Sequence, residues 1–235
     1  MLKAVTLDFW GTLANDRRSG AQARIEALGA VLPARTPAQV AEAYRLAWAR
    51  FQEAGAHGWG LPPAALLSMT LDGLSATLRP PEYDHVLAAW ETAHLLYPPL
   101  LLPEVPETLR ALRRQGLLVA LISDTGATPG SGLREYLVQQ GIRALFDWLT
   151  FSNETGVTKR QPQAFLCTLA ALGVRPEEAF HLGDTPASDV LGAQAAGLYA
   201  GLTIELHDRR SPGCQPDLVV ERLRDLPGAL KQLPG

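Results

Sequence analysis

Short apolar runs alternate with amphipathic stretches along most of the chain. The runs have the length of buried strands, and each ends at or beside a polar residue: they cover residues 3–8, 117–123, 148–152, 179–183 and 198–204, while residues 218–220 predict a further strand at an edge. The stretches between them have helical periodicity and stop at a glycine: 106–115, 131–140, 162–172 and 186–196. Strand–helix alternation with short links predicts an α/β protein with a Rossmann-like, doubly wound parallel sheet.

Residues 16 to 99 interrupt this alternation. They contain helical patterns only, divided by prolines at positions 33, 62–63, 80–81 and 98–99. Residues 36–39 (TPAQ) have the sequence of a capping box with proline at the first helical position, so a helix is expected to begin there. We therefore expect about four helices in a domain of residues 16–99, inserted into an α/β core domain made of residues 1–15 and 100–235.

The composition suits a folded protein that acts on small molecules. Of 235 residues, 47% are hydrophobic and 19% charged, which argues against disorder. The formal net charge of −3 leaves no basic surplus to neutralise nucleic acid, and no apolar run reaches the length of about 20 residues that crosses a bilayer. The first residues lack the layout of a signal peptide, and Cys167 and Cys214 lack zinc-site spacing. We expect a cytoplasmic protein whose cysteines are reduced. It is expected to be a monomer or a homodimer and to bind neither nucleic acid nor membranes.

The expected strands end in residues that can carry chemistry. Asp8 follows the first strand, Ser123 and Asp124 the second, Asn153 the third and Asp184 the fourth. Ligands of an open α/β sheet bind beyond the carboxyl ends of its strands, so these side chains are expected to meet. Crowded carboxylates either share a proton or bind a cation, and an all-oxygen cluster favours Mg²⁺. Such an ion, together with a lysine and a serine, suits an anionic substrate.

Four segments, in order along the chain, resemble the motifs of the haloacid dehalogenase-like hydrolases. Residues 8–13 (DFWGTL) resemble the first motif, D-x-D-G-T-L, and residues 121–124 (LISD) resemble the second. Residues 152–159 (SNETGVTK) resemble the third motif, and residues 183–189 (GDTPASD) resemble the fourth, GDxxxxD. The resemblance implies the Rossmann-like core of that family, and it identifies the inserted helices with the family's C1-type cap, which lies between the first two motifs.

Carried over residue by residue, the resemblance implies a phosphoryl-transfer site. Asp8 would be the nucleophile that forms an aspartyl-phosphate, Ser123 would donate a hydrogen bond to a phosphoryl oxygen, and Lys159 would neutralise charge on the transferring group. The expected substrate is a small phosphorylated metabolite.

The same resemblance implies a magnesium site and a set of substrate contacts. Asp8, the backbone carbonyl of Trp10, Asp184 and Asp189 would hold Mg²⁺. The candidate substrate-binding residues lie beside these positions: Thr12, Asp124 and Thr125.

Trp10 stands where the family's phosphatases have a second aspartate. That aspartate protonates the leaving oxygen and later deprotonates the attacking water, and an indole does neither. Because general acid–base help contributes roughly 10²–10⁴-fold, simple alkyl phosphates are expected to react slowly. The metal site is unaffected, since its ligand at position 10 is a backbone carbonyl.

Three alternatives follow from this substitution. The family's 2-haloacid dehalogenases carry an aromatic residue here, because expelling halide needs no proton, but they lack the Gly-Asp pair of the fourth motif. Asp184 beside Asp8 without a cation would be electrostatically unfavourable, which argues for a metal. Phosphonate hydrolysis would need a lysine in the cap, and none lies between Lys3 and Lys159. We therefore expect a Mg²⁺-dependent phosphatase, with a 2-haloacid dehalogenase or a weakly active, phosphate-binding regulatory protein as alternatives.

Several other positions are expected to have ordinary structural roles. Residues 126–132 (GATPGSG) match neither glycine-rich nucleotide-binding pattern and are expected to form a turn. His181 lies inside a strand-like run and is expected to be packed in the core. Arg17 and Arg18 are expected at the solvated surface, whereas Trp59 is the candidate for a cap residue that faces the site.

Overall fold

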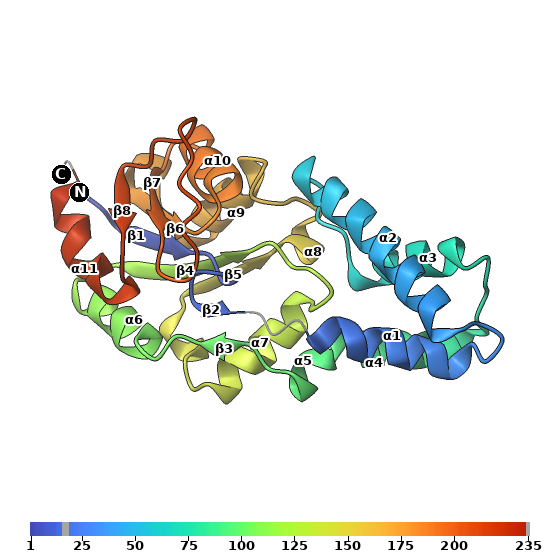
Figure 1. Ribbon diagram of the computed structural model, residues 1–235. Coiled ribbons are helices and arrows are strands. Elements are labelled where there is room, and N and C mark those ends of the chain that lie inside the picture. Colours follow the sequence, from blue (N-terminus) through green and yellow to red (C-terminus); the bar gives the residue numbers. More distant parts are fainter. Residues whose placement is uncertain (16–18, 234–235) are drawn as a thin grey trace.

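A parallel sheet of six strands forms the centre of the molecule (Figure 1). In this computed structural model, which describes residues 1–15 and 19–233, the strand order is β5-β4-β1-β6-β7-β8. All neighbouring strands in it run parallel, which confirms the predicted fold class. The strands are β1 (Ala4–Leu7), β4 (Leu118–Ser123), β5 (Trp148–Phe151), β6 (Ala179–Gly183), β7 (Tyr199–Thr203) and β8 (Leu218–Val220).

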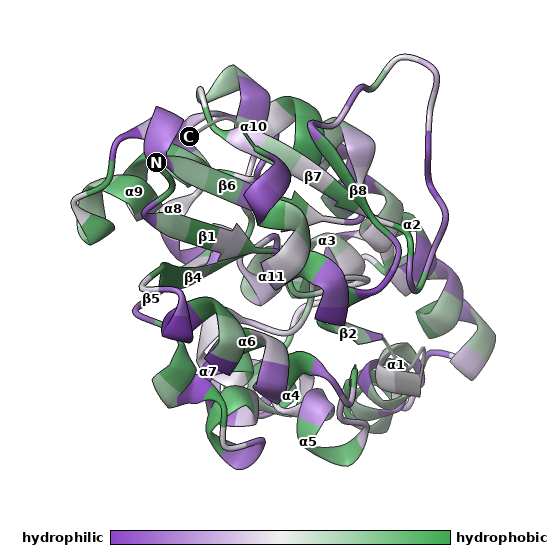
Figure 2. Ribbon diagram, turned by 90° about the vertical axis from the view of Figure 1, so that its left-hand side faces the viewer, coloured by the Kyte–Doolittle hydropathy of each residue, from purple (hydrophilic) through white to green (hydrophobic). Residues whose placement is uncertain are grey.

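Helices cover both faces of this sheet. On one face α6 (Val105–Arg114), α7 (Gly130–Gln139) and α11 (Leu226–Ala229) pack in one hydrophobic core, and on the other α9 (Gln163–Leu172) and α10 (Leu191–Ala195) pack in a second. Figure 2 shows β1, β4 and β6 as mostly hydrophobic along their length, as expected of strands buried on both faces. The shorter helical pieces are α8 (Ser152–Thr155) and the turns Arg143–Leu145, Pro176–Glu178, Leu223–Asp225 and Leu230–Gln232.

The remaining helices lie beyond the carboxyl ends of the strands (Figure 1). Residues such as Leu67 and Trp90 give them a hydrophobic core of their own. The expected capping box is present, because Gln39 N donates to Thr36 Oγ1 (3.3 Å) and Thr36 N donates to Gln39 Oε1 (2.8 Å). The helices are α1 (Ser19–Val31), α2 (Pro37–Ala56), α3 (Pro63–Gly73), α4 (Pro80–Glu91) and α5 (Ala93–Leu96).

A short antiparallel pair joins the two ends of this helical segment. β2 (Ala14–Asn15) pairs with β3 (Leu100–Leu101), Asn15 opposite Leu100. The pair lies at the boundaries expected for a cap domain of residues 16–99, and the division into two domains stays a prediction. No helix within the described ranges is long and apolar enough to span a membrane.

The loop after α2 forms a second connection to the core. Gly60 N donates to Gly156 O (2.9 Å), Thr158 N donates to Gly58 O (3.0 Å), and Thr158 Oγ1 donates to Gly55 O (2.9 Å). Thr158 precedes Lys159, so these bonds attach the helical segment to the loop that carries the candidate catalytic lysine.

The helix expected over residues 186–196 is present, but it begins with a wide π-helical turn, Pro186–Val190, and then continues as α10. The Leu191 N–H closes the wide turn by donating to Pro186 O. Just before it, Asp189 N donates to Thr185 O (2.8 Å) and Thr185 N donates to Asp189 Oδ2 (2.8 Å).

Residues 126–132 divide between a turn and a helix. Residues 126–128 form a bend, as expected, and residues 130–132 begin α7, in agreement with the helix expected over 131–140. Asn153 Oδ1 accepts the Gly130 N–H (3.0 Å) and so fixes the start of the helix. The residue at 132 must be small, because a Cβ atom there would lie 2.6 Å from Cε1 of His94.

Candidate active site

Polar side chains converge at the carboxyl ends of β1, β4 and β6. Asp8 follows β1, Asp124 follows β4 and Asp184 follows β6, and these strands are neighbours in the sheet. They surround a cavity of about 240 Å³. Its lining is largely polar: Asp8, Trp10, Gly11, Asn15, Asp124, Lys159, Asp184, Thr185, Ser188, Asp189, His207 and Arg209.

Asp8 is buried, and both of its carboxylate oxygens are held. Oδ1 accepts a hydrogen bond from Lys159 Nζ at 2.5 Å, and Oδ2 accepts one from Thr12 Oγ1 at 3.0 Å. The Asp8 N–H donates to Leu182 O (2.9 Å), which fixes the end of β1 against β6. Thr12, a candidate substrate-binding residue, is itself buried and orients the Asp8 carboxylate.

Lys159 is held by three carboxylates. Its Nζ lies 2.5 Å from Asp8 Oδ1 and 2.5 Å from Asp189 Oδ1, and its backbone N–H donates to Asp124 Oδ1 at 2.9 Å. The side chain is only 3% exposed. The ammonium group is therefore fixed beside the carboxylate that would act as nucleophile.

His181 extends this network into the sheet. Its ring is fully buried, as expected, but Nε2 also lies 3.1 Å from Asp189 Oδ1, and Nδ1 lies 2.8 Å from Thr6 Oγ1. Burial lowers the pKa of His181, so the ring is neutral near pH 7 and the arrangement has Nε2–H donating to Asp189. This role could not be predicted, because a histidine inside an apolar run has the sequence pattern of any core residue.

The site carries an excess of negative charge. Burial raises the pKa of Asp8, Asp124 and Asp184, and the charge of Asp189 raises all three further. Burial also acts to raise the pKa of Asp189, but Lys159 and His181 outweigh it and hold that pKa below its usual range. Burial acts to lower the pKa of Lys159, but the carboxylates of Asp189, Asp8 and Asp124 outweigh it and hold that pKa above its usual range. Four carboxyl groups around one buried lysine favour binding of a further cation.

Asp184 has the features of a metal ligand. It is 2% exposed, and its Oδ2 accepts no hydrogen bond from the residues that the structure describes. The Nη1 of Arg209, a half-exposed side chain, forms an ion pair with that oxygen at 2.8 Å. One oxygen each of Asp8, Asp184 and Asp189 lie within 4.8 Å of one another. This all-oxygen donor set fits Mg²⁺.

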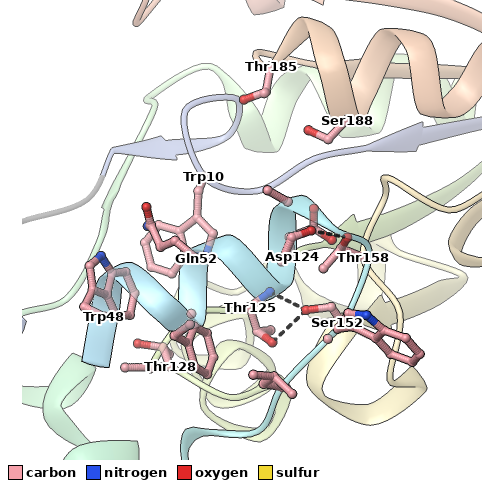
Figure 3. A pocket seen from close by; sticks show the side chains of 18 of the residues that line it. Trp10, Trp48, Gln52, Asp124, Thr125, Thr128, Ser152, Thr158, Thr185 and Ser188 are labelled. Carbon is pink, nitrogen blue, oxygen red and sulfur yellow. Dashed lines mark hydrogen bonds between the residues drawn. The ribbon is translucent and has the colours of Figure 1, made fainter. Parts of the chain in front are cut away.

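Two residues at the end of β4, Ser123 and Thr125, differ in whether their hydroxyl groups are free to bind a ligand. Ser123 Oγ is buried and finds no hydrogen-bond partner in the described part of the chain, so its donor is available to a ligand. Thr125 is occupied: its N–H donates to Ser152 Oγ (2.9 Å), as Figure 3 shows. Its hydroxyl donates to Asn153 Oδ1 (3.0 Å). Thr125 thus joins the loops after β4 and β5.

A larger cavity, of about 580 Å³, adjoins the first one between the core and the helices. Trp10 lines both cavities, and Figure 3 shows it pointing toward α2, which carries Trp48 and Gln52. Trp59 lines the larger cavity, as expected, and is 60% exposed. Arg17 and Arg18 lie outside the described residues. The aromatic residues that line the larger cavity are Trp10, Trp48, Phe51, Trp59 and Tyr97.

Comparison with known proteins places these features in a family. The sequence profile of the haloacid dehalogenase-like hydrolases matches residues 2–197. A phosphoserine phosphatase of Thermus thermophilus is 39% identical over 126 residues, which cover 54% of this chain and about half (49%) of that protein. A glyceraldehyde 3-phosphate phosphatase of Methanopyrus kandleri is 27% identical over 99% of both chains.

Solved structures share the fold. A phosphatase of the family from Thermococcus onnurineus superimposes with a TM-score of 0.71 at 21% identity, over 97% of this chain and 98% of that one. A 2-haloacid dehalogenase from Pseudomonas syringae superimposes with a TM-score of 0.72 at 21% identity, over 99% of both chains. The fold is therefore common to enzymes of both kinds.

Proposed function

The chain belongs to the haloacid dehalogenase-like hydrolases, and within that family we propose that it is a Mg²⁺-dependent phosphatase of a small phosphomonoester. The observation that carries the proposal is the meeting of Asp8, Lys159 and Asp184 in one cavity, where a buried oxygen of Asp184 is paired, among the described residues, with the half-exposed Arg209 and accepts no hydrogen bond. Two relatives named as phosphatases of phosphoserine and glyceraldehyde 3-phosphate support a small phosphorylated substrate.

In the proposed reaction Asp8 is the nucleophile. One of its carboxylate oxygens bonds to phosphorus while the bond from phosphorus to the leaving oxygen breaks, and the leaving oxygen keeps the electron pair. Water then attacks the phosphorus of the aspartyl-phosphate, which releases inorganic phosphate and restores the Asp8 carboxylate. Thr12 orients that carboxylate through a hydrogen bond of 3.0 Å.

Two further side chains would bind the phosphoryl group. The Lys159 ammonium, 2.5 Å from Asp8 Oδ1, would offset the negative charge of the approaching phosphate. The Ser123 hydroxyl, which lacks a hydrogen-bond partner within the described residues, would donate to a phosphoryl oxygen. Asp124 and Thr125 would lie beside the substrate at the end of β4.

Asp8 and Asp184 would hold Mg²⁺, with Asp189 and the carbonyl of Trp10 beside them. When bound, the ion would neutralise charge on the phosphoryl oxygens. Arg209 pairs with Asp184 through a half-exposed side chain, and it can withdraw into solvent when the metal binds.

A second candidate function is favoured by one residue. Trp10 suits a 2-haloacid dehalogenase, in which a carboxylate displaces halide from carbon and no leaving group needs a proton. Asp184 argues against it, because a buried carboxylate beside Asp8 and Asp189 is far easier to accommodate with a metal ion present.

The test of the proposal is hydrolysis of p-nitrophenyl phosphate by the wild type and by Asp8→Asn. The nitrophenolate leaves with little protonation, so the absence of the second aspartate matters least with this substrate. We expect turnover with Mg²⁺, none with excess chelator, and none in the variant. Turnover of 2-chloropropionate without metal would favour the dehalogenase. Trapping of beryllofluoride on Asp8 in a folded protein that turns over neither substrate would favour a phosphate-binding regulatory protein.

We also propose that the enzyme acts in the cytoplasm on free metabolites. The net charge of −3 disfavours binding to nucleic acid, and both cysteines, Cys167 and Cys214, are unpaired thiols. Localisation of the tagged protein by fractionation tests this, and recovery in an oxidising compartment would contradict it.

A further inference from the structure

Trp10 lies at the junction of the two cavities, next to the expected position of the bond that is cleaved. It lines both the cavity of Asp8 and the larger one beside the helices. With the phosphoryl group next to Asp8 and Lys159, the organic part of the substrate extends into the larger cavity, and the leaving oxygen lies at this junction. The indole there has a single weak N–H donor and gives no proton to a leaving oxygen.

Other acids near the junction are few. Asp184 is paired with Arg209, and Asp189 is held by Lys159 and His181. Three side chains among the described lining residues could still donate a proton. Asp124 lines both cavities, although its Oδ1 already accepts the Lys159 N–H, and His207 lies on the exposed loop after β7. His94 lines the larger cavity, and its buried Nε2 has no hydrogen-bond partner among the described residues.

A leaving group that departs as a stable anion does not need a proton. A phenol has a pKa of about 10, whereas an aliphatic hydroxyl is closer to water, at about 15.7. Without a general acid, an aryl ester therefore reacts much faster than an alkyl ester. The position of Trp10 thus favours substrates whose leaving oxygen is attached to an aromatic ring.

The larger cavity independently fits such a ring. Trp48 and Phe51 form a parallel pair on α2, with ring centroids 5.7 Å apart. The edge of Trp48 reaches the end of β4, since a Cβ atom at Gly126 would lie 2.9 Å from its Cη2. Aromatic rings bind other rings in edge-to-face and offset geometries. A volume of about 580 Å³ is that of a ligand pocket and leaves room for much more than a three-carbon acid.

We infer that the substrate is a phosphate monoester of a phenol-type alcohol, whose ring occupies the larger cavity beside Trp48 and Trp10. The inference rests on the proposed function and specifies its substrate class. The bond between phosphorus and the phenolic oxygen breaks as Asp8 bonds to phosphorus, and the phenolate keeps the electron pair and takes a proton from water after release. A nucleoside 5′-phosphate has a flat base but an aliphatic leaving oxygen, so it is disfavoured.

Phenyl phosphate and benzyl phosphate separate the two properties of the substrate. Both carry the same ring and charge, but only the first has a phenolic leaving oxygen. We expect kcat/KM for phenyl phosphate to exceed that for benzyl phosphate by about 100-fold or more, because the missing acid contributes roughly 10²–10⁴-fold to alkyl esters. An enzyme with a general acid would hydrolyse the two esters at similar rates.

Variants at position 10 test the cause. Trp10→Asp supplies an acid and should raise kcat/KM for benzyl phosphate by about 10- to 100-fold while changing kcat/KM for phenyl phosphate by less than about threefold. The parameter kcat/KM covers only the steps up to release of the alcohol, so any gain in the attack of water, which is common to both substrates, does not enter it. Trp10→Asn introduces a side chain of the same size as aspartate that cannot donate an acidic proton, so it should give no such gain. Asp124→Asn, His207→Gln and His94→Gln should leave the phenyl-to-benzyl ratio of kcat/KM unchanged, and a selective loss of benzyl phosphate hydrolysis in any of the three would overturn the inference.

Trp48→Ala tests the ring site. We expect the KM for phenyl phosphate to rise severalfold while the KM for acetyl phosphate, which has no ring, stays constant. Leu46→Ala, at an exposed position of the same helix, should change neither. Equal kcat/KM values for phenyl phosphate and benzyl phosphate would overturn the inference, and so would a KM for phenyl phosphate that Trp48→Ala leaves unchanged. In either case, hydrolysis of acetyl phosphate would still support the proposed function. No hydrolysis of any phosphate with Mg²⁺ would overturn both.

Discussion

At the scale of single residues, the loop after β1 depends on glycine at position 11. The residue has φ +80°, and a Cβ atom there would lie 2.1 Å from Asp184 Oδ2. The glycine therefore allows the first motif to approach the candidate metal ligand of the fourth. No other residue type combines that backbone conformation with that approach without strain.

Gly11→Ala should accordingly damage both stability and metal binding. We expect a loss of about 1–3 kcal/mol in unfolding free energy and a weaker affinity for Mg²⁺, because the methyl group displaces Asp184. Gly29→Ala is the matched control, since that glycine lies in α1 with nothing within 4 Å of the added Cβ, and it should stabilise the protein slightly. Chemical denaturation and titration calorimetry measure the two effects. A Gly11→Ala protein with unchanged Mg²⁺ affinity would contradict the assignment of Asp184.

Glu178 gives a pH-dependent contribution to stability. Its carboxylate pairs with Arg175 (3.0 Å) and with Lys3 (2.8 Å), the residue before β1, and these bonds lower the pKa of Glu178 to about 2. Because the folded pKa is below the unfolded value of 4.5, the stabilisation is present above pH 4.5 and is lost as the pH falls toward 2.

Denaturation of the wild type and of Glu178→Gln at several pH values should show this. The variant is expected to be less stable at pH 7, and the difference should shrink between pH 4.5 and 2. Glu177→Gln is the control, because Glu177 pairs with the same arginine through an exposed side chain and should have little effect. A difference between wild type and Glu178→Gln that is constant with pH would exclude the ion pairs as its source.

The individual site residues were predictable to the extent that each ends a strand. Asp8, Ser123 and Asp184 follow apolar runs, and their strands are neighbours in the sheet, so position along the chain implied position in space. The hydrogen bonds among them were not predictable. His181 supports Asp189 from within β6, and only the side-chain geometry distinguishes it from an ordinary core residue.

At the scale of elements, α2 shows how far local sequence determines structure. Thr36 and Gln39 form the expected capping box, with Pro37 at the first helical position. The helix over residues 186–196 was predictable, but its π-helical first turn was not, because the apolar period there suits a continuous α-helix. In that turn the Leu191 N–H donates to Pro186 O, and Asp189 within it is fixed by Thr185 and faces Lys159.

Thr36→Ala should cost about 1 kcal/mol of stability, because a helix N-terminus loses a side-chain acceptor. Gln39→Ala removes the other half of the box. We expect the double variant to lose less than the sum of the two single losses, since each residue acts through the other. Urea denaturation of the four proteins measures the coupling, and strictly additive losses would mean that the box is not formed in solution.

At the scale of the whole molecule, metal binding should stabilise the fold. Asp8 is distant in the chain from Asp184 and Asp189, so the three carboxylates meet only in the folded protein. A ligand that binds only the folded state adds stability, about 2.7 kcal/mol at 100 times its Kd. We therefore expect Mg²⁺ to raise the unfolding temperature of the wild type, and chelator to lower it again.

Two variants identify the source of this stabilisation. Asp184→Asn should abolish the Mg²⁺-dependent shift, and Arg209→Gln should produce the same shift at a lower Mg²⁺ concentration, because a competing cation has been removed from Asp184. An equal shift in wild type and Asp184→Asn would place the ion elsewhere.

The overall architecture followed from the alternation of strands and helices, whereas the contacts between distant segments did not. The loop of residues 55–61 binds residues 156–158 through backbone groups, which leave no trace in the sequence except glycines. The same holds for the larger cavity, whose aromatic lining comes from the first motif, α2, the loop after α2 and the end of α5. Helical periodicity identified Trp48 and Phe51 as one apolar face but not as the wall of a cavity.

The place of β1 in the sheet has a consequence for how the protein is made. β1 is made before the other strands of its sheet, yet it is central, and Val5 pairs with Val119 on one side and Phe180 on the other. At roughly 5–20 residues per second, its second neighbour follows only after about 10–35 s. During that time the helices of residues 19–96 can form, and β4 becomes available to one edge of β1. The other edge of this apolar central strand stays unpaired until residues 179–183 have been made.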